Sequence, residues 1–340
     1  MNRRYVFVTD LSESLAKLIF RDLEELSDVD IIPSRSHYPK TKIGKIASKI
    51  IFSSRINKII HLPFHWKMSG IKKYHFNDDI EYIVIFTNNA LSHNDNCVRE
   101  KLRKRKNLKL VLVLLDSLEI ETKYGEQLRE VVAENNNWDA IYTYDFGDSK
   151  KYNLEYLNEC YYSDLRSIKG DKNTSDVYFA GRIKPGKEEI IKKLVSFFNL
   201  NKIKYDIKLW LKPGDEKYCS GQLERYNIET FSEPKDYSSI ISELQGANCI
   251  LEILQNNQEA PSLRYYEAVL FNKKLLTNNK NIKKLNFYNP AYMKMFKDPG
   301  DIDIEWLKKK ETVNYNYNGE FSPKNLIKMI DNKFKTEKQQ

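Results

Sequence analysis

Cysteine and long apolar runs are both scarce in this chain of 340 residues. The four cysteines form no C-x-x-C pair and are spaced far apart, at Cys97, Cys160, Cys219 and Cys249. This spacing favours reduced, structural thiols over a zinc site or a disulfide framework. No eighteen consecutive apolar residues occur, and Asp10 ends the first apolar run too early for a secretory signal peptide. The sequence therefore predicts a cytoplasmic protein that does not span a membrane.

Two familiar phosphate-binding patterns are absent as well. The chain has no G-x-x-x-x-G-K-S/T motif, and no G-x-G-x-x-G follows its first predicted strand, residues 5–9. These absences argue against a P-loop nucleotidase and against a dinucleotide-binding oxidoreductase.

Positive charge is concentrated in one segment. The net charge is +9, and residues 34–77 contain ten Lys and Arg but no Asp or Glu, so the rest of the chain is close to neutral. Nucleic-acid enzymes usually spread positive charge along an extended track, so we expect no nucleic-acid partner. The segment combines an isoleucine stripe with cationic and aromatic residues, and its candidate contacts to anionic lipid headgroups are Lys42, Lys45, Lys49 and Trp66. The alternative is an ordinary helix packed on a sheet, with its lysines in water.

Short β-branched runs alternate with helical periods along the chain, with one interruption. Runs such as residues 110–115 are almost continuously apolar, which is typical of parallel strands covered on both faces. A polar, glycine-containing break at residues 166–175 separates two such series. We therefore predict an α/β fold of two Rossmann-like domains, residues 1–165 and 176–315, and a last helix within residues 316–340 that packs back on the first domain. Ligands are expected in a central cleft, at the carboxyl ends of the strands.

The strongest local signal is the segment 258–268 (QEAPSLRYYEA), which follows an apolar strand and opens a helix near Pro261. A helix N-terminus there offers N–H groups to a diphosphate. Arg264 would add a bidentate phosphate contact, and Glu267 would accept hydrogen bonds from ribose hydroxyls. The pattern alone also allows a structural interpretation, with proline at a helix start, glutamate near the helix dipole and arginine in a surface pair.

This segment resembles the donor-site segment of bacterial lipopolysaccharide and capsule glycosyltransferases of the GT-B type, in a CgeB-like group. Those enzymes carry Q-S-G-L-T-x-R-x-x-E-A followed by K-K-L-I-T-x-N. Gln258, Arg264, Glu267 and most of residues 273–279 match, whereas Ala260 replaces the glycine of the pattern. Similarities in the same order extend over residues 82–306. Glu259 and Glu267 also have the E-x7-E spacing of many retaining GT-B enzymes.

The resemblance implies that the second domain holds a nucleotide sugar without an obligatory metal or cofactor. The donor-binding candidates are Arg182, Lys187, Gln258, Glu259, Ser262, Arg264 and Glu267. Arg182 and Lys187 belong to a glycine-containing segment after the first strand of that domain. The alternative interpretation of this segment is a simple Pro-Gly turn. In an inverting transfer, Asp10 or Asp116 would take the proton of the acceptor hydroxyl, and His93 is a weaker candidate. Asp10 also has the D-x-x-E spacing of a capping box, and a retaining transfer needs no such base.

The resemblance therefore implies a glycosyltransferase of surface glycan synthesis, acting at the inner face of the cell membrane. Its acceptor would be a polysaccharide or a polyprenyl-diphosphate-linked oligosaccharide of a capsule, lipopolysaccharide or exopolysaccharide. One alternative is a non-catalytic nucleotide- or sugar-binding partner in a polysaccharide assembly complex. Two others are a nucleic-acid-binding protein and a nucleotide-sugar epimerase, which would need paired acid and base groups near the sugar carbon.

Overall fold

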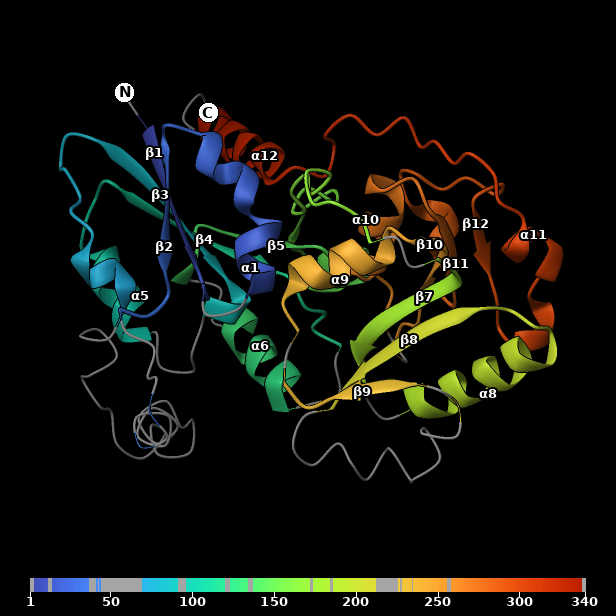
Figure 1. Ribbon diagram of the computed structural model, residues 1–340. Helices are drawn as coiled ribbons and strands as arrows, with labels where there is room; N and C mark the ends of the chain where they lie inside the picture. Colours follow the sequence, from blue (N-terminus) through green and yellow to red (C-terminus); the bar gives the residue numbers. More distant parts are fainter. Residues whose placement is uncertain are drawn as a thin grey trace. The chain divides into compact units, whose positions relative to one another are not determined.

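The computed structural model describes two compact units of the chain (Figure 1). The described residues are 3–11, 14–36, 41, 43, 69–90, 96–119, 123–133, 137–171, 174–183, 186–211, 226, 228–233, 235–255 and 258–337. The first unit, here the N-terminal unit, comprises Met1–Ser163 together with Phe321–Gln340. The second, the C-terminal unit, comprises Asp164–Glu320. Each unit is considered by itself below.

The N-terminal unit is built on a parallel six-stranded sheet. Its strands are β1 (Arg3–Thr9), β2 (Val29–Pro33), β3 (Glu81–Thr87), β4 (Leu108–Leu114), β5 (Ala140–Thr143) and β6 (Glu155–Tyr156). They pair in the order β2-β1-β3-β4-β5-β6. The order reverses between β1 and β3, which is the position where sheets of this topology bind ligands. β3 is buried along its whole length, as expected for a parallel strand covered on both faces.

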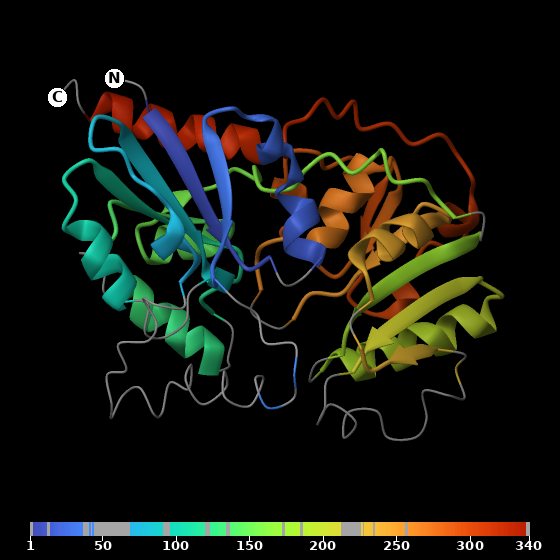
Figure 2. The same ribbon diagram turned by 60° about the vertical axis from the view of Figure 1, so that its left-hand side comes forward.

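Helices cover both faces of this sheet, and one of them comes from the end of the chain (Figures 1 and 2). They are α1 (Ser14–Ile19), η1 (Arg21–Glu25), η2 (Gly70–Lys73), η3 (Asn88–Ala90), α5 (Asn96–Arg103), α6 (Lys123–Ala133), α7 (Phe146–Lys151) and α12 (Pro323–Thr336). The chain re-enters this unit where Tyr162 N donates to Phe321 O at 2.8 Å. Ser322 Oγ then donates to the buried Asp22 at 2.7 Å, and an Arg3–Asp331 ion pair ties α12 to β1.

The C-terminal unit contains a second parallel six-stranded sheet. Its strands are β7 (Ser175–Arg182), β8 (Tyr205–Trp210), β9 (Glu229–Phe231), β10 (Ala247–Glu252), β11 (Lys274–Thr277) and β12 (Met293–Met295). They pair in the order β12-β11-β10-β7-β8-β9, which is the 3-2-1-4-5-6 order of a nucleotide-binding Rossmann sheet read from the other edge. The order reverses between β7 and β10, so the connections that follow these two strands diverge to opposite sides and leave a crevice.

The two faces of this second sheet differ in polarity. The helices are α8 (Lys187–Leu200), α9 (Tyr237–Leu244), α10 (Leu263–Leu270), η7 (Ile282–Lys284), η8 (Pro299–Asp301) and α11 (Ile304–Lys308). α8 and α11 cover one face, where apolar side chains such as Phe179 and Leu251 form the core. α9 and α10 cover the other face (Figures 1 and 2). Because side chains alternate along a strand, Tyr178 and Glu252 point to that second face.

The predicted fold class, an α/β protein of two Rossmann-like domains, is confirmed by these two sheets. No helix among the described residues is long and apolar enough to cross a membrane.

Candidate functional site

Two helix N-termini lie at the crevice between β7 and β10. The chain leaves β7 at Arg182 and enters α8 at Lys187. The N-cap residue of α8, Gly186, has φ 84°, a conformation that glycine adopts without strain. It leaves β10 at Glu252 and enters α10 behind Ser262, whose side chain accepts from Arg264 N at 3.3 Å. The positive ends of two helix dipoles favour an anion at this edge of the sheet.

A buried carboxylate occupies the same edge. The Glu252 side chain is fully buried at the end of β10. Its Oε1 accepts from Ser262 N at 2.6 Å and from Ser262 Oγ at 2.8 Å, and its Oε2 accepts from Thr277 Oγ1 at 2.6 Å. Glu252 therefore joins the ends of β10 and β11 to the first turn of α10. Sequence reasoning missed this residue, although a single acid in the apolar run 249–254 was a usable signal.

The predicted pair on α10 is brought together by the helix. Arg264 and Glu267 lie three residues apart on one face, and Arg264 Nη1 is 2.7 Å from Glu267 Oε2. The other carboxylate oxygen of Glu267 accepts from the Tyr237 hydroxyl at the start of α9. The Glu267 side chain is 0% exposed and that of Arg264 is 10% exposed. In this structure both oxygens of Glu267 therefore have protein partners.

Burial dominates the ionisation of both carboxyls. It raises the pKa of Glu267 from 4.5 to about 7, although the Arg264 charge and the Tyr237 hydrogen bond act in the opposite direction. Burial also raises the pKa of Glu252, against the hydrogen bonds from Thr277 and Ser262 and the charge of Lys187. Each carboxyl adds to the other's cost of ionisation, since the Glu252 charge raises the pKa of Glu267 further. Buried acids with shifted pKa values beside a crevice are typical of a functional site.

The remaining donor-site candidates surround this group at different degrees of exposure. Arg182 is half-buried at the end of β7, and Lys187 is half-buried in the first turn of α8. Gln258 turns back on its own loop, because its Nε2 donates to Ala260 O at 3.1 Å. Glu259 is exposed to solvent. The structure thus brings Lys187, Ser262 and the α10 pair to one edge of the sheet, while Gln258 closes a turn.

Further ionisable groups continue along the face covered by α9. Tyr178 OH donates to Glu243 at 3.0 Å, and Lys208 Nζ is 3.0 Å from the same carboxylate. Lys235 also pairs with Glu243, at 3.4 Å. These contacts fix α9 against the sheet and hold Tyr237 beside Glu267.

In the N-terminal unit, the predicted base Asp116 is held by two side-chain hydrogen bonds. It follows β4, and its Oδ2 accepts from Asn88 Nδ2 at 2.8 Å and from Tyr124 OH at 3.2 Å. Asn88 is itself fixed, since its Oδ1 accepts from Leu115 N at 2.7 Å. Asp10 directly follows β1 and is half-buried. β3 lies between β1 and β4, so the two carboxylates start from strands about 10 Å apart.

A second carboxyl group fixes the loop of Asp116. Asp148 is buried in α7, behind the N-cap residue Asp145, and its Oδ2 accepts from Leu118 N at 2.7 Å. Burial raises the pKa of Asp148 to about 6, with the Asp145 charge acting in the same direction. Asp145 therefore caps the helix, and Asp148, three residues later, anchors the loop of Asp116.

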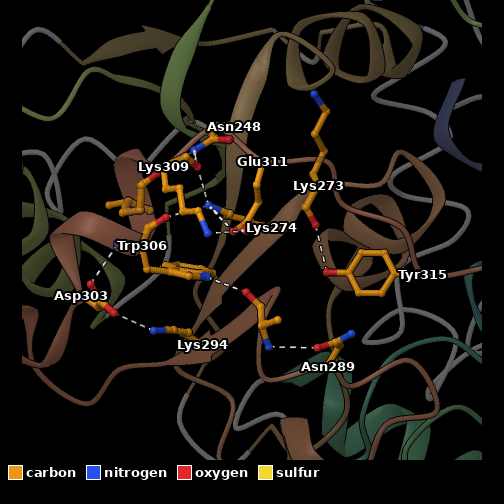
Figure 3. A network of polar contacts seen from close by, with 12 residues as sticks. Asn248, Lys273, Lys274, Asn289, Lys294, Asp303, Trp306, Lys309, Glu311 and Tyr315 are labelled. Atoms are coloured by element: carbon orange, nitrogen blue, oxygen red, sulfur yellow. Dashed lines mark hydrogen bonds and ion pairs between the residues drawn. The ribbon is translucent and has the colours of Figure 1, made fainter.

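The two lysines at the start of β11 have a structural role (Figure 3). The Lys274 side chain is fully buried, and its Nζ donates to Trp306 O at 2.7 Å and to Lys309 O at 2.5 Å, and pairs with Glu311 at 3.0 Å. It thereby binds the carbonyls at the C-terminal end of α11. Lys273 is tied to the same region, because its carbonyl accepts from Tyr315 OH at 3.0 Å.

These lysines lie at the opposite end of β11 from Thr277, so they do not reach the crevice. A groove of about 650 Å³ opens beside them, lined in part by Lys294, Asp303 and Trp306. Lys294 is paired with Asp303 at 2.7 Å, and its ammonium lies 5.3 Å from the centre of the Trp306 ring. The charges of Lys294 and Asp303 are therefore used within the protein.

Five residues of the sequence predictions fall outside the described part of the chain: Lys42, Lys45, Lys49, Trp66 and His93. Their proposed roles stay predictions.

The comparisons with known proteins relate to the fold. No family model matches the sequence, and no curated protein matches it. Among solved structures, HepE of Anabaena, solved in complex with UDP and glucose, matches with a TM-score of 0.57 at 12% identity, over 99% of this chain and 100% of that chain. This likeness shows the two-domain α/β architecture of the GT-B class.

Two further matches have lower TM-scores. The UDP-N-acetylglucosamine 2-epimerase of Rickettsia bellii matches with a TM-score of 0.48 at 9% identity, over 97% of this chain and 96% of that chain. The lipopolysaccharide outer core galactosyltransferase WaaB matches with a TM-score of 0.45 at 9% identity, over 88% of this chain and 87% of that chain. Glycosyltransferases and epimerases thus both occur among the matches, and the chemistry has to be argued from the site.

Proposed function

We propose that this protein is a glycosyltransferase that moves a sugar from a nucleoside-diphosphate donor to an acceptor in bacterial surface glycan synthesis, within the CgeB-like group. One observation supports this most directly. The crevice at the switch point of the C-terminal sheet gathers Lys187, the N-cap Ser262 and the Arg264–Glu267 pair at the ends of β7 and β10. Helix N-termini with nearby cations are suited to a diphosphate.

The donor is proposed to be a UDP-sugar, since HepE was solved with UDP and glucose and shares the fold. Lys187 and Arg264 would neutralise the diphosphate, aided by Arg182 and the two helix dipoles. When the glycosidic bond breaks, negative charge grows on the departing diphosphate, and preorganised cations stabilise that charge without a metal ion. Glu267 would hold the ribose, with a ribose hydroxyl taking the place that the Tyr237 hydroxyl has here.

The N-terminal unit is proposed to present the acceptor. Asp116, oriented by Asn88 and Tyr124, is the favoured base for an inverting transfer, and Asp10 is the second candidate. The basic segment with Lys42, Lys45, Lys49 and Trp66 would bind the anionic inner face of the membrane, where a polyprenyl-diphosphate-linked acceptor lies.

One observation favours a non-catalytic partner instead. The Ser262 donors at the α10 N-terminus are already used by Glu252, and both oxygens of Glu267 are engaged. A protein that only stabilises an assembly complex would need no open donor site. Turnover decides between the two functions.

The test uses purified full-length protein and a panel of nucleotides and UDP-sugars. We expect UDP to raise the melting temperature by mass action, and one UDP-sugar to be hydrolysed or transferred in the presence of EDTA. Lys187→Ala should weaken UDP binding at least tenfold, whereas Lys193→Ala, on an exposed position of the same helix, should not. Binding without turnover of any UDP-sugar favours the non-catalytic partner. No binding of any nucleotide contradicts both functions.

A further inference from the structure

Glu252 uses the hydrogen-bond donors that a phosphate would use. Its carboxylate accepts from both the N–H and the hydroxyl of Ser262, the N-cap residue of α10. It is fully buried, and Thr277 holds its other oxygen at 2.6 Å. The free protein therefore has a carboxyl group of its own at the α10 N-terminus.

A diphosphate beside this carboxylate would place two anionic groups against one helix end. Like charges at short distance in a buried setting repel strongly, and one of them takes up a proton where a proton is available. Burial makes this carboxyl a weaker acid than usual, and the phosphates of UDP are almost fully ionised at pH 8. Protonated Glu252 keeps one acceptor oxygen for Ser262 and gains an O–H that donates a hydrogen bond to an incoming phosphate oxygen.

We propose that Glu252 is a positioning residue that couples donor binding to proton uptake, remaining ionised on Ser262 in the free protein and becoming protonated when a nucleoside diphosphate binds at the same turn. This inference rests on the proposed function of the crevice. The proton comes from the buffer and is bound by one carboxylate oxygen, and no covalent bond of the donor changes in this step.

The surroundings of Glu252 favour this coupling. Lys187 from α8 stabilises the Glu252 carboxylate by its charge, and Glu252 in turn raises the pKa of Glu267 on α10. From β11, the uncharged Thr277 donates a hydrogen bond to Glu252. Burial has already raised the pKa of Glu252, so little further repulsion is needed to protonate it. When a diphosphate draws Lys187 to itself, the support that the lysine charge gives to the carboxylate is also reduced.

The test is calorimetric titration of the full-length protein with UDP at pH 8, in two buffers with different ionisation enthalpies. The difference in apparent heat gives the number of protons bound. We expect the wild-type protein to take up between half and one proton, and its UDP affinity to fall by up to about tenfold per pH unit above the pKa of Glu252. Glu252→Gln keeps an acceptor for Ser262 and removes the charge, so it should bind UDP more tightly at pH 8 without this uptake.

Glu233→Gln, an exposed acid between β9 and α9, is the matched control and should behave as wild type. Thr277→Val removes a hydrogen bond that favours the ionised carboxyl, so it should move the midpoint of the pH profile upward. UDP binding by the wild-type protein without proton uptake overturns the inference and leaves the proposed function intact. Uptake that persists unchanged in Glu252→Gln overturns it too, since the proton then goes elsewhere. No UDP binding at all overturns the proposed function and this inference with it.

Discussion

Replacing Lys274 by methionine tests whether the K-K pair of the sequence pattern serves the fold or the donor. Methionine keeps most of the buried volume and removes the ammonium. The lost contacts are two hydrogen bonds to α11 carbonyls, at 2.7 and 2.5 Å, and an ion pair with Glu311 at 3.0 Å. Hydrogen bonds of a charged group are worth about 1.5–3 kcal/mol each, from which the cost of burying the ammonium is subtracted.

Glu311 is 24% exposed and regains water when the ammonium is removed, so we take the lower end of the range for a broken buried pair, about 3 kcal/mol. For a unit of this size, 1 kcal/mol shifts the melting temperature by about 2–4 °C, so we expect Lys274→Met to lower that of the C-terminal unit by about 6–12 °C. The UDP affinity should stay within twofold of wild type at a temperature where the unit is folded, because Lys274 lies at the opposite end of β11 from the crevice.

Lys309→Met is the matched control, since this lysine is 65% exposed and pairs with the same Glu311 at 3.1 Å. Exposed pairs contribute about 1 kcal/mol or less, so this variant should melt within about 4 °C of wild type. Thermal unfolding followed by circular dichroism and calorimetric UDP titration measure the two properties. Equal melting temperatures of the two variants would refute the structural role of Lys274. A tenfold loss of UDP affinity in folded Lys274→Met would indicate that the lysine contributes to the donor site.

Three more predictions concern the proposed donor site, the proposed base and the proposed membrane contact. Glu267 has a pKa of about 7 when folded and 4.5 when unfolded, so the folded state holds the extra proton and the stability of the C-terminal unit should fall as pH rises from about 4.5 to 7. Urea titrations over this range should show a slope that Glu267→Gln lacks. Asp116→Asn should lower kcat at least a hundredfold with little change in KM if the transfer inverts, as initial-rate kinetics will show. Replacing Lys42, Lys45 and Lys49 together by glutamine should weaken sedimentation with anionic liposomes, and full retention would favour packing on the sheet.

The sequence prediction of the fold depended on apolar runs and on the residues that start helices. The first strand, predicted at residues 5–9, is observed as Arg3–Thr9, and the helix predicted to open near Pro261 begins at Leu263. By contrast, the short edge strands Glu155–Tyr156 and Met293–Met295 have no apolar run of their own, so periodicity gives no signal for them. Their pairing depends on the neighbouring strand, which only the folded sheet supplies.

The site was predictable only in part for a related reason. The i,i+3 spacing of Arg264 and Glu267 indicates that the two side chains meet on the helix. The partners from other elements, such as Tyr237 on Glu267 and Glu252 on Ser262, come from residues up to thirty positions away. The same holds for the second half of the matched pattern, where Lys274 anchors the end of α11. A motif shows which residues occur together in sequence, whereas the end of the strand on which each lies decides its role.

The hydrogen bond between Tyr162 and Phe321 makes the C-terminal unit an insertion within the other unit. The chain leaves the N-terminal unit directly after Ser163 and returns at Phe321, so both crossings start from neighbouring points on one body. Domains inserted in this way have ends close enough to be joined by a short peptide. Residues 164–320 should therefore be separable as a gene fragment, and the remaining two pieces should fold together once a brief linker replaces the excised part.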